Sequence, residues 1–142
     1  MRRLTAFALA ACLAACATPS ATPTAPPPAA MKTLNGSLVT RQRIALPPQA
    51  EAIVKLVDVS RADAPATVLA ETRFKTDGRQ VPLPFRLEYD PARIDARMRY
   101  AVSGELRVGE RILFLNTTRH GVLTHGGAAD NIELVLDQLP GR

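Results

Sequence analysis

The sequence predicts an all-β fold, a single antiparallel β-sandwich of about seven strands with an immunoglobulin-like or transthyretin-like shape. From residue 34 onward apolar and polar residues alternate, which is the two-residue period of a strand with one buried face. Turn-forming pairs separate the alternating segments at intervals typical of a sandwich. A chain of 142 residues is long enough for one such domain. A small β-barrel is the alternative architecture.

The N-terminus has the layout of a bacterial lipoprotein signal. A basic start precedes an apolar stretch from Leu4 to Ala15, which is too short to span a bilayer and ends in small residues that suit a cut. A cysteine directly after the cut supplies the thiol that accepts a diacylglycerol. We therefore expect residues 1–15 to be removed and Cys16 to carry fatty acyl chains such as palmitate. Cys12 ends the same tetrapeptide, Leu-Ala-Ala-Cys, and the choice between the two cysteines stays open.

Residues 16–31 form the second segment, an acylated cysteine followed by a tether rich in Pro, Ala and Thr. The tether holds five prolines and no charge, so it favours disordered, extended polyproline conformations. At roughly 3.1 Å per residue it reaches about 40 Å. An acidic residue after the cysteine retains some lipoproteins in the inner membrane, and Ala17 stands there instead. We therefore expect an outer-membrane anchor with the domain facing the periplasm.

Alternation and turns divide the folded domain, residues 32–139, into strands. Asp77-Gly78 predicts a two-residue hairpin, and Gly109-Glu110 suits a type II′ turn between two later strands. Asp90 before a proline suits an N-cap, so a short helical turn is expected over 91–96. The expected strands are 34–44, 51–60, 67–76, 79–89, 98–108, 111–117 and 131–137.

Two prolines mark one edge of the predicted sheet. Val81, Leu83 and Phe85 point to one face of their strand, while Pro82 and Pro84 point to the other. Residues two apart direct their N–H groups toward the same neighbour, so both missing donors lie on one side and predict an edge strand. A partner strand could pair with the free part of this edge, or the prolines could block such pairing. These five residues are the candidate partner-binding edge.

The aromatic residues and one glycine complete the predicted core. Gly104 stands at an apolar position of the alternating run 98–108, which indicates either a bulge or a close approach of another segment. The large side chains expected in the core are Phe74, Phe85, Tyr89, Tyr100 and Phe114.

Three stretches carry a family resemblance: 43–48 (Arg-Ile-Ala-Leu-Pro-Pro), 56–66, and 81–95 with its Val-Pro-Leu-Pro-Phe start and Tyr-Asp-Pro continuation. Together they resemble the YbaY-like family of bacterial envelope lipoproteins, which is grouped with the YscW-type pilot and chaperone lipoproteins of type III secretion. The resemblance covers about residues 33–137. It implies a β-sandwich lipoprotein without known catalytic residues. For a subset of the family it also implies a pilot role, in which the lipoprotein helps a secretin to assemble in the outer membrane.

Few residues offer chemistry. His120 and His125 are the only imidazoles, and a zinc site would need a third ligand, for which Asp130 is the nearest candidate. Exposed loop histidines are the simpler interpretation, and we expect no metal. The three serines of the domain lack the glycine pattern of a nucleophile elbow. We therefore predict no catalytic residues, no enzyme activity and no cofactor other than the covalent lipid on Cys16.

The charge narrows the list of partners. The net charge of +5 comes from dispersed residues, and two of the basic ones lie in the signal, so nucleic-acid binding is not expected. The expected partners are the membrane, through the lipid anchor, and an envelope protein. We predict a non-catalytic binding or chaperone-like domain on the outer membrane. The alternative is a structural or stress-related envelope lipoprotein; a secretin pilot proper or a periplasmic enzyme ranks lower.

Overall fold

The computed structural model describes residues 30–140, so the signal, Cys16 and the tether up to residue 29 lie outside the described residues. A single 3-10 turn, η1 (Pro91–Arg93), accompanies eight strands. Within residues 30–140 no helix is long and apolar enough to cross a membrane. The strands are β1 (Lys32–Thr40), β2 (Glu51–Asp58), β3 (Thr67–Lys75), β4 (Leu83–Tyr89), β5 (Tyr100–Val108), β6 (Arg111–Leu115), β7 (His120–Val122) and β8 (Ile132–Gln138).

The all-β prediction is confirmed, and all seven expected strands form, some with shifted ends. The expected helical turn is the short η1, where the Asp90 side chain accepts a hydrogen bond from the N–H of Ala92 as an N-cap does. Sequence reasoning missed β7. A strand of three residues is too short to show an alternating pattern.

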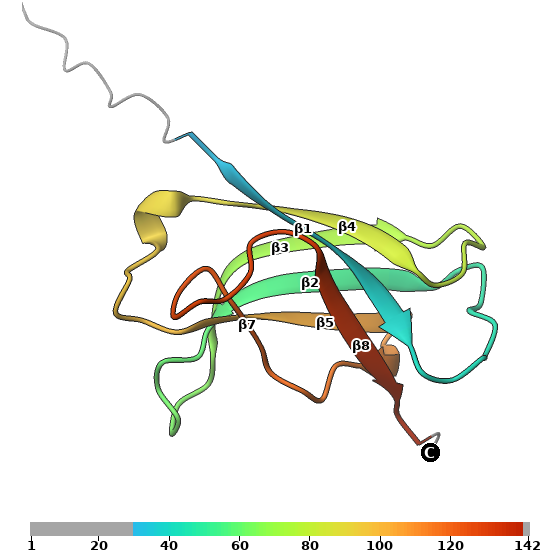
Figure 1. Cartoon of the computed structure of the whole chain (residues 1–142). Helices are drawn as coiled ribbons and strands as arrows, with labels where there is room; N and C mark the ends of the chain where they lie inside the picture. The colour runs from blue at the N-terminus through green and yellow to red at the C-terminus, as the bar shows by residue number, and fades with distance from the viewer. Residues whose placement is uncertain (1–29, 141–142) are drawn as a thin grey trace, which may run out of the picture.

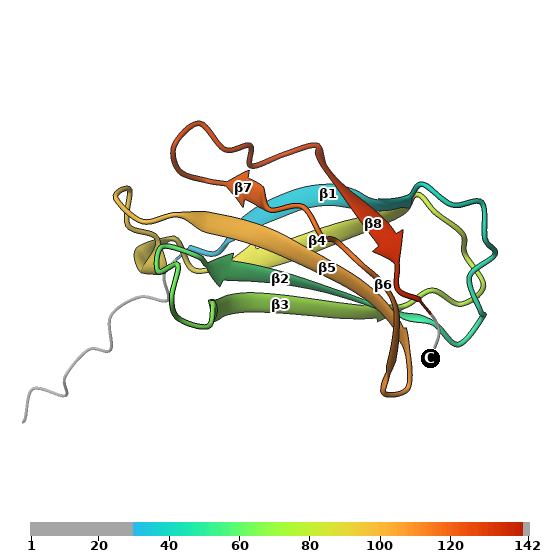
Figure 2. The same ribbon diagram turned by 90° about the horizontal axis from the view of Figure 1, so that it is seen from below.

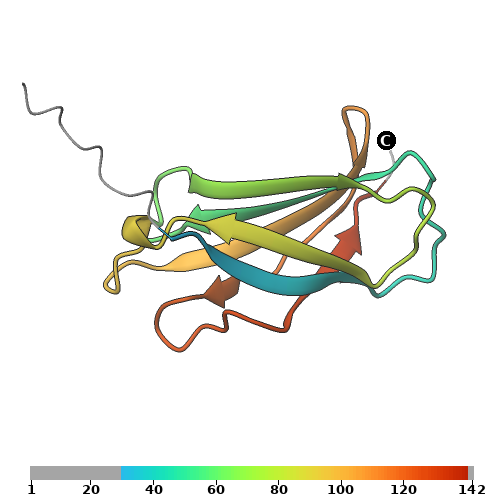
Figure 3. The same cartoon turned by 90° about the horizontal axis from the view of Figure 1, so that it is seen from above.

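The strands form one curled sheet in the order β3-β2-β5-β6-β8-β1-β4, with β7 added beside β5. β4, β1 and β8 lie on one side of the core and β3, β2 and β5 on the other (Figure 2). Only a short pairing of β6 with β8 joins the two sides. The two ends of the order, β3 and β4, lie side by side (Figures 1 and 3). The sheet is therefore nearly closed.

The sheet is not purely antiparallel, which corrects one prediction. β1 and β8 pair in parallel, with Gly36 opposite Ile132 and Thr40 opposite Leu136. Opposite directions are imposed only on strands joined by a tight turn. Because β1 and β8 come from the two ends of the domain, their relative direction is free to follow the packing.

The predicted hairpin at Asp77-Gly78 is also wrong, although its turn forms. Both residues have a left-handed φ, +50° and +78°, and the N–H of Arg79 donates to the carbonyl of Thr76 at 2.9 Å. However, β3 pairs with β2, while β4 pairs with β1. Pro84 has no N–H to give on the side that faces β3, so the two strands cannot form a regular ladder. In contrast, the turn at Gly109-Glu110 joins a true hairpin of β5 and β6.

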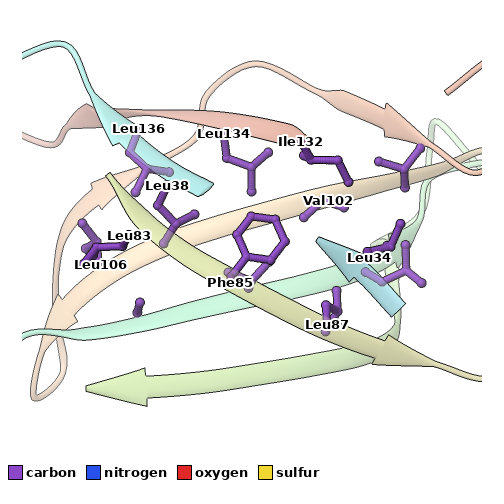
Figure 4. Packing of buried hydrophobic residues seen from close by; sticks show 14 of the residues in the cluster. Leu34, Leu38, Leu83, Phe85, Leu87, Val102, Leu106, Ile132, Leu134 and Leu136 are labelled. Carbon is purple, nitrogen blue, oxygen red and sulfur yellow. The ribbon is translucent and has the colours of Figure 1, made fainter. Parts of the chain in front are cut away.

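The core lies between the two sides of the sheet, filled mainly by leucine side chains from β1, β4 and β8 that meet those of β2 and β5 (Figure 4). Four of the five predicted aromatic residues are buried there, and Phe74 is half-buried. Gly104 marks a close approach, since an added Cβ would lie 2.9 Å from Leu38 Cδ2. The bulge in β5 lies further on, after Leu106.

Gly36 provides a test of this packing. An added Cβ would overlap the carbonyl oxygen of Ile132 and come within 2.6 Å of the Phe85 ring. We expect Gly36→Ala to lower the free energy of unfolding by about 3 kcal/mol, because a backbone carbonyl cannot move away cheaply. Gly121→Ala is the matched control, since its nearest neighbour would be 3.9 Å away. Urea unfolding followed by circular dichroism measures both, and equal stability of the two variants would contradict the packing.

Candidate functional site

The free edges of the sheet form the candidate site. β3 has a sheet neighbour only in β2, and β4 only in β1. The two free edges run beside each other without a ladder between them (Figures 1 and 3). We call this line the β3–β4 seam, formed by residues 69–75 of β3 and 83–89 of β4. It is the place where the sheet of residues 30–140 is left open.

Three of the predicted edge residues, Leu83, Pro84 and Phe85, lie in β4 on the seam, while Val81 and Pro82 lie in the segment just before it. Leu83 and Phe85 are buried, with 0% and 5% of their surfaces exposed. Val81 is half-buried and packs against the core, while Pro82 and Pro84 are exposed. The edge position of this strand is therefore as predicted. A partner at this edge would meet backbone and prolines first, and would reach the two buried side chains only by opening the seam.

The backbone groups of β4 that face the seam follow from the prolines. Pro84 cannot donate to β1, so it belongs to the set of residues whose N–H positions point away from β1. Arg86 and Glu88 share its parity and retain their N–H groups. The N–H of Asn35 on β1 donates toward Ala129, on the β8 side, which agrees with this alternation because Asn35 is paired with Arg86. Along the seam, β4 therefore offers backbone N–H donors in its second half, at Arg86 and Glu88.

Side chains close the seam at both ends. At one end the guanidinium of Arg93, on η1, donates from Nη1 to the carbonyl of Leu69 on β3 at 2.8 Å. At the other end Arg79 donates to the carbonyls of Lys75 and Thr76 at 3.2 and 3.1 Å. The same guanidinium lies 6.0 Å from the centroid of the Phe74 ring. The Arg93 contact links the segment after β4 to β3, whereas Arg79 binds carbonyls three and four residues before it in the chain.

Apolar side chains lie under the seam. Leu69 and Phe74 of β3, together with Val81 and Ile94 from the segments that flank β4, are half-buried and pack against the core. The outward side chains above them are charged, with Glu71 on β3 as an example. Charged side chains on free edges discourage unselective pairing with other chains. The seam can therefore bind an extended segment through backbone groups and apolar contacts, while its surface charges select among partners.

The loop after β4 holds Arg93 in place. The N–H of Asp95 donates to the hydroxyl of Tyr100 at 2.9 Å, which ties the loop to β5. Arg97 donates to the carboxylate of Asp95 from its backbone and its guanidinium. These hydrogen bonds and the neighbouring cation lower the pKa of Asp95 to about 2. Nothing in the sequence marked Arg93 or the edge of β3 as part of a site, because both depend on which strands become neighbours.

The remaining candidates do not come together. His120 lies in β7, His125 lies in the following loop, and no group of three metal-binding side chains occurs among residues 30–140. Asp130 instead accepts a hydrogen bond from Asn35 at 3.0 Å. Burial, with a smaller contribution from the Asp130 carboxylate, raises the pKa of Tyr89. Cys16, the predicted site of lipidation, lies outside the described residues.

The hydroxyls of two serines are used within the fold. Ser60 donates to the carboxylate of Asp58, and Ser103 donates to the side chain of Asn116 at 3.3 Å. Across residues 30–140 no hydrogen bond joins a serine hydroxyl to a histidine. The described residues therefore do not assemble the pair that a serine hydrolase needs.

The chain is similar to known lipoproteins and to a pilotin. Residues 29–136 match the family described as "Type III secretion system lipoprotein chaperone (YscW)". A curated relative, "Uncharacterized lipoprotein YbaY" of Escherichia coli K12, is 36% identical over 102 residues, which make up 72% of this chain and 54% of that protein. The chain thus spans about half the length of this relative. A solved alternative pilotin from the type II secretion system of Vibrio cholerae matches with a TM-score of 0.75 and 42% identity, over 79% of this chain and 100% of its own.

Removal of the Arg93 guanidinium tests the closure of the seam. We expect Arg93→Ala to lower the free energy of unfolding by about 1 kcal/mol, the net contribution of one hydrogen bond. Amide hydrogen exchange should speed up in β3, measured by mass spectrometry. Arg111→Ala is the matched control, because the exposed Arg111 side chain makes no hydrogen bond or ion pair within residues 30–140. Unchanged exchange in Arg93→Ala would show that the contact does not close the seam.

The Asp95–Arg97 pair predicts a pH dependence. Because the folded-state pKa of Asp95 lies below its ordinary value of 3.8, the pair stabilises the fold above pH 3.8 and loses this effect as the pH falls toward 2. We expect the carboxyl carbon of Asp95 to titrate near pH 2 in a nuclear magnetic resonance experiment. In Arg97→Ala the midpoint should move back toward 3.8. An unchanged midpoint in that variant would contradict the assignment of the shift to Arg97.

Proposed function

This chain belongs to the YscW family of lipoprotein chaperones, which includes YbaY-like proteins, and we propose that it is an outer-membrane-anchored lipoprotein whose β domain binds an envelope protein without catalysing a reaction. The family supports a lipoprotein with a chaperone-like role. The anchor at Cys16, the outer membrane and the periplasmic orientation are our proposals from the signal, the tether and Ala17.

The β3–β4 seam is the observation that carries the binding role. Two free edges with unpaired backbone groups lie over half-buried apolar side chains, and this combination suits an extended segment of a partner. The match to a family of lipoprotein chaperones supports a non-catalytic domain. We also keep the sandwich interpretation of the architecture, since β4-β1-β8 packs against β3-β2-β5 across one core.

The partner that we propose first is an outer-membrane component of a secretion machine, a secretin. The similarity to a pilotin, at 42% identity, supports this partner. The pilot role, which ranked lower from the sequence, therefore becomes the leading candidate role. The alternative is a structural or stress-related envelope lipoprotein. The match over 102 residues to an uncharacterised lipoprotein is compatible with that role as well. A deletion strain with unaltered sensitivity to detergent and salt would count against that alternative.

Site-specific crosslinking in the native envelope tests the proposal. A photoreactive amino acid replaces either Glu88 on β4, beside the seam, or Glu133 on β8, as a matched exposed position away from it. After illumination the acylated protein is purified and the captured proteins are identified by mass spectrometry. We expect a secretin or another envelope protein to be captured from position 88 and not from position 133.

A variant without the Cys16 thiol tests the proposed lipid anchor. We expect Cys16→Ala to leave the outer-membrane fraction, because the acyl chains supply most of the membrane affinity at about 0.8 kcal/mol per buried CH₂. Capture from position 88 should then fall as well. If Cys16→Ala fractionates with membranes as the natural protein does, this anchor is rejected. If proteins are captured from position 133 alone, the seam is rejected as the binding surface.

A further inference from the structure

A cavity of about 300 Å³ lies away from the β3–β4 seam, at the end of the domain where β1 begins. Its walls come from four places: Val59 after β2, Arg99 and Tyr100 at the start of β5, Arg119 and Gly121 just before and within β7, and the loop after β7. The register brings these segments together, because Asp58 is paired with Tyr100. Tyr100 is in turn paired with Val122.

Two arginines, Arg99 and Arg119, line the cavity together with His125, and no Asp or Glu does. Neither guanidinium makes a hydrogen bond or ion pair with any residue of the described part of the chain. Neither Asp58, which accepts from Ser60, nor Asp95, which accepts from Arg97, belongs to the lining. The lining itself therefore carries a net positive charge.

Hydrogen bonds hold the backbone of both walls. The N–H of Arg99 donates to the Ser60 hydroxyl at 2.8 Å, and its carbonyl accepts from the N–H of Val59 at 2.9 Å. Across the cavity the hydroxyl of Thr124 donates to the carbonyl of Met98 at 2.8 Å. The loop after β7 is thus tied to the segment before β5 beside the cavity. The hydrogen bonds also fix the backbone from which the Arg99 side chain extends.

The loop of the opposite wall adds backbone donors. His125 and Gly126 have left-handed φ values of +54° and +80° in a turn that the N–H of Gly127 closes onto the carbonyl of Thr124. The N–H groups of His125 and Gly126 donate to no acceptor within residues 30–140. Free amides of such turns are common ligands of anions.

We propose that this cavity is a binding site for a phosphate group. Two guanidiniums suit the oxygens of a phosphate, which they can bind through paired charge-assisted hydrogen bonds. The imidazole and the free amides add further donors. A volume of about 300 Å³ is small for a ligand pocket, so it suits a phosphate with at most a small substituent.

The phosphate has two possible sources, a membrane lipid headgroup or free inorganic phosphate. The cavity and the start of β1 lie at the same end of the domain, since Lys32 is paired with Tyr89 and the following loop leads directly to Arg99. A tether that leads from Lys32 to a lipidated Cys16 would therefore bring this end toward the headgroups. The headgroup source rests on the proposed anchor, whereas binding of free phosphate does not.

The test uses the full acylated protein in uncharged detergent micelles, with three probes: inorganic phosphate, phosphatidylglycerol mixed into the micelles, and diacylglycerol as the lipid without phosphate. Nitrogen-15 shifts of the Arg99 and Arg119 guanidiniums and of the Gly126 amide report binding. We expect saturable shifts with at least one phosphate-bearing probe and none with diacylglycerol. Shifts with inorganic phosphate identify free phosphate as sufficient, and shifts with phosphatidylglycerol alone identify the headgroup.

Charge-matched variants separate a site from general attraction. The double variant Arg99→Gln/Arg119→Gln should weaken binding at least about tenfold, because it removes two charge-assisted contacts. The control is Arg41→Gln/Arg111→Gln, which removes the same charge from two exposed arginines at the opposite end. Circular dichroism confirms folding of each variant.

Two results would overturn the proposal: no saturable shift with either phosphate-bearing probe, or equal weakening by the two double variants. Neither result bears on the crosslinking from the seam, so a failure here is distinguishable from a failure of the proposed function.

Discussion

A missing hydrogen-bond donor on β4 marks where this sheet stays open. Pro84 has no N–H to give on the side that faces β3, β3 and β4 form no ladder, and the curled sheet does not close. A barrel would have removed both free edges. Here Arg93 and Arg79 cover the ends of the seam with side-chain hydrogen bonds instead. Such contacts lie near solvent and cost less to open than a ladder, which suits a surface that binds and releases a partner.

The two ends of the domain differ in what they offer. The Arg93 contact and the cationic cavity lie at the end where β1 begins, and hydrogen bonds tie the loops there to Tyr100 of β5 and to Arg99 just before it. A lipoprotein domain held at this end would keep the cavity toward the membrane and leave the length of the seam open to the periplasm. Anchoring, headgroup contact and partner binding would then use separate surfaces of one small fold.

Family membership and geometry constrain function in different ways. The match to lipoprotein chaperones supports the proposed class of role, and the similarity to a pilotin supports the proposed kind of partner. Neither says which surface is used. The seam follows from the positions of β3 and β4, and the cavity follows from the convergence of the segments that carry Val59, Arg99 and His125.

The sequence by itself determined seven of the eight strands of residues 30–140, the turn at Gly109 and the edge position of β4, because alternation and a missing N–H act within a few residues of the chain. The signal predicted for residues 1–15, with acylation at Cys16, likewise rests on a local pattern. Tertiary structure alone decided the parallel pairing of β1 with β8, the separation of β3 from β4 and the placement of Arg99 and Arg119 in the lining of one cavity. These depend on which distant strands become neighbours, and packing of the whole core makes that choice.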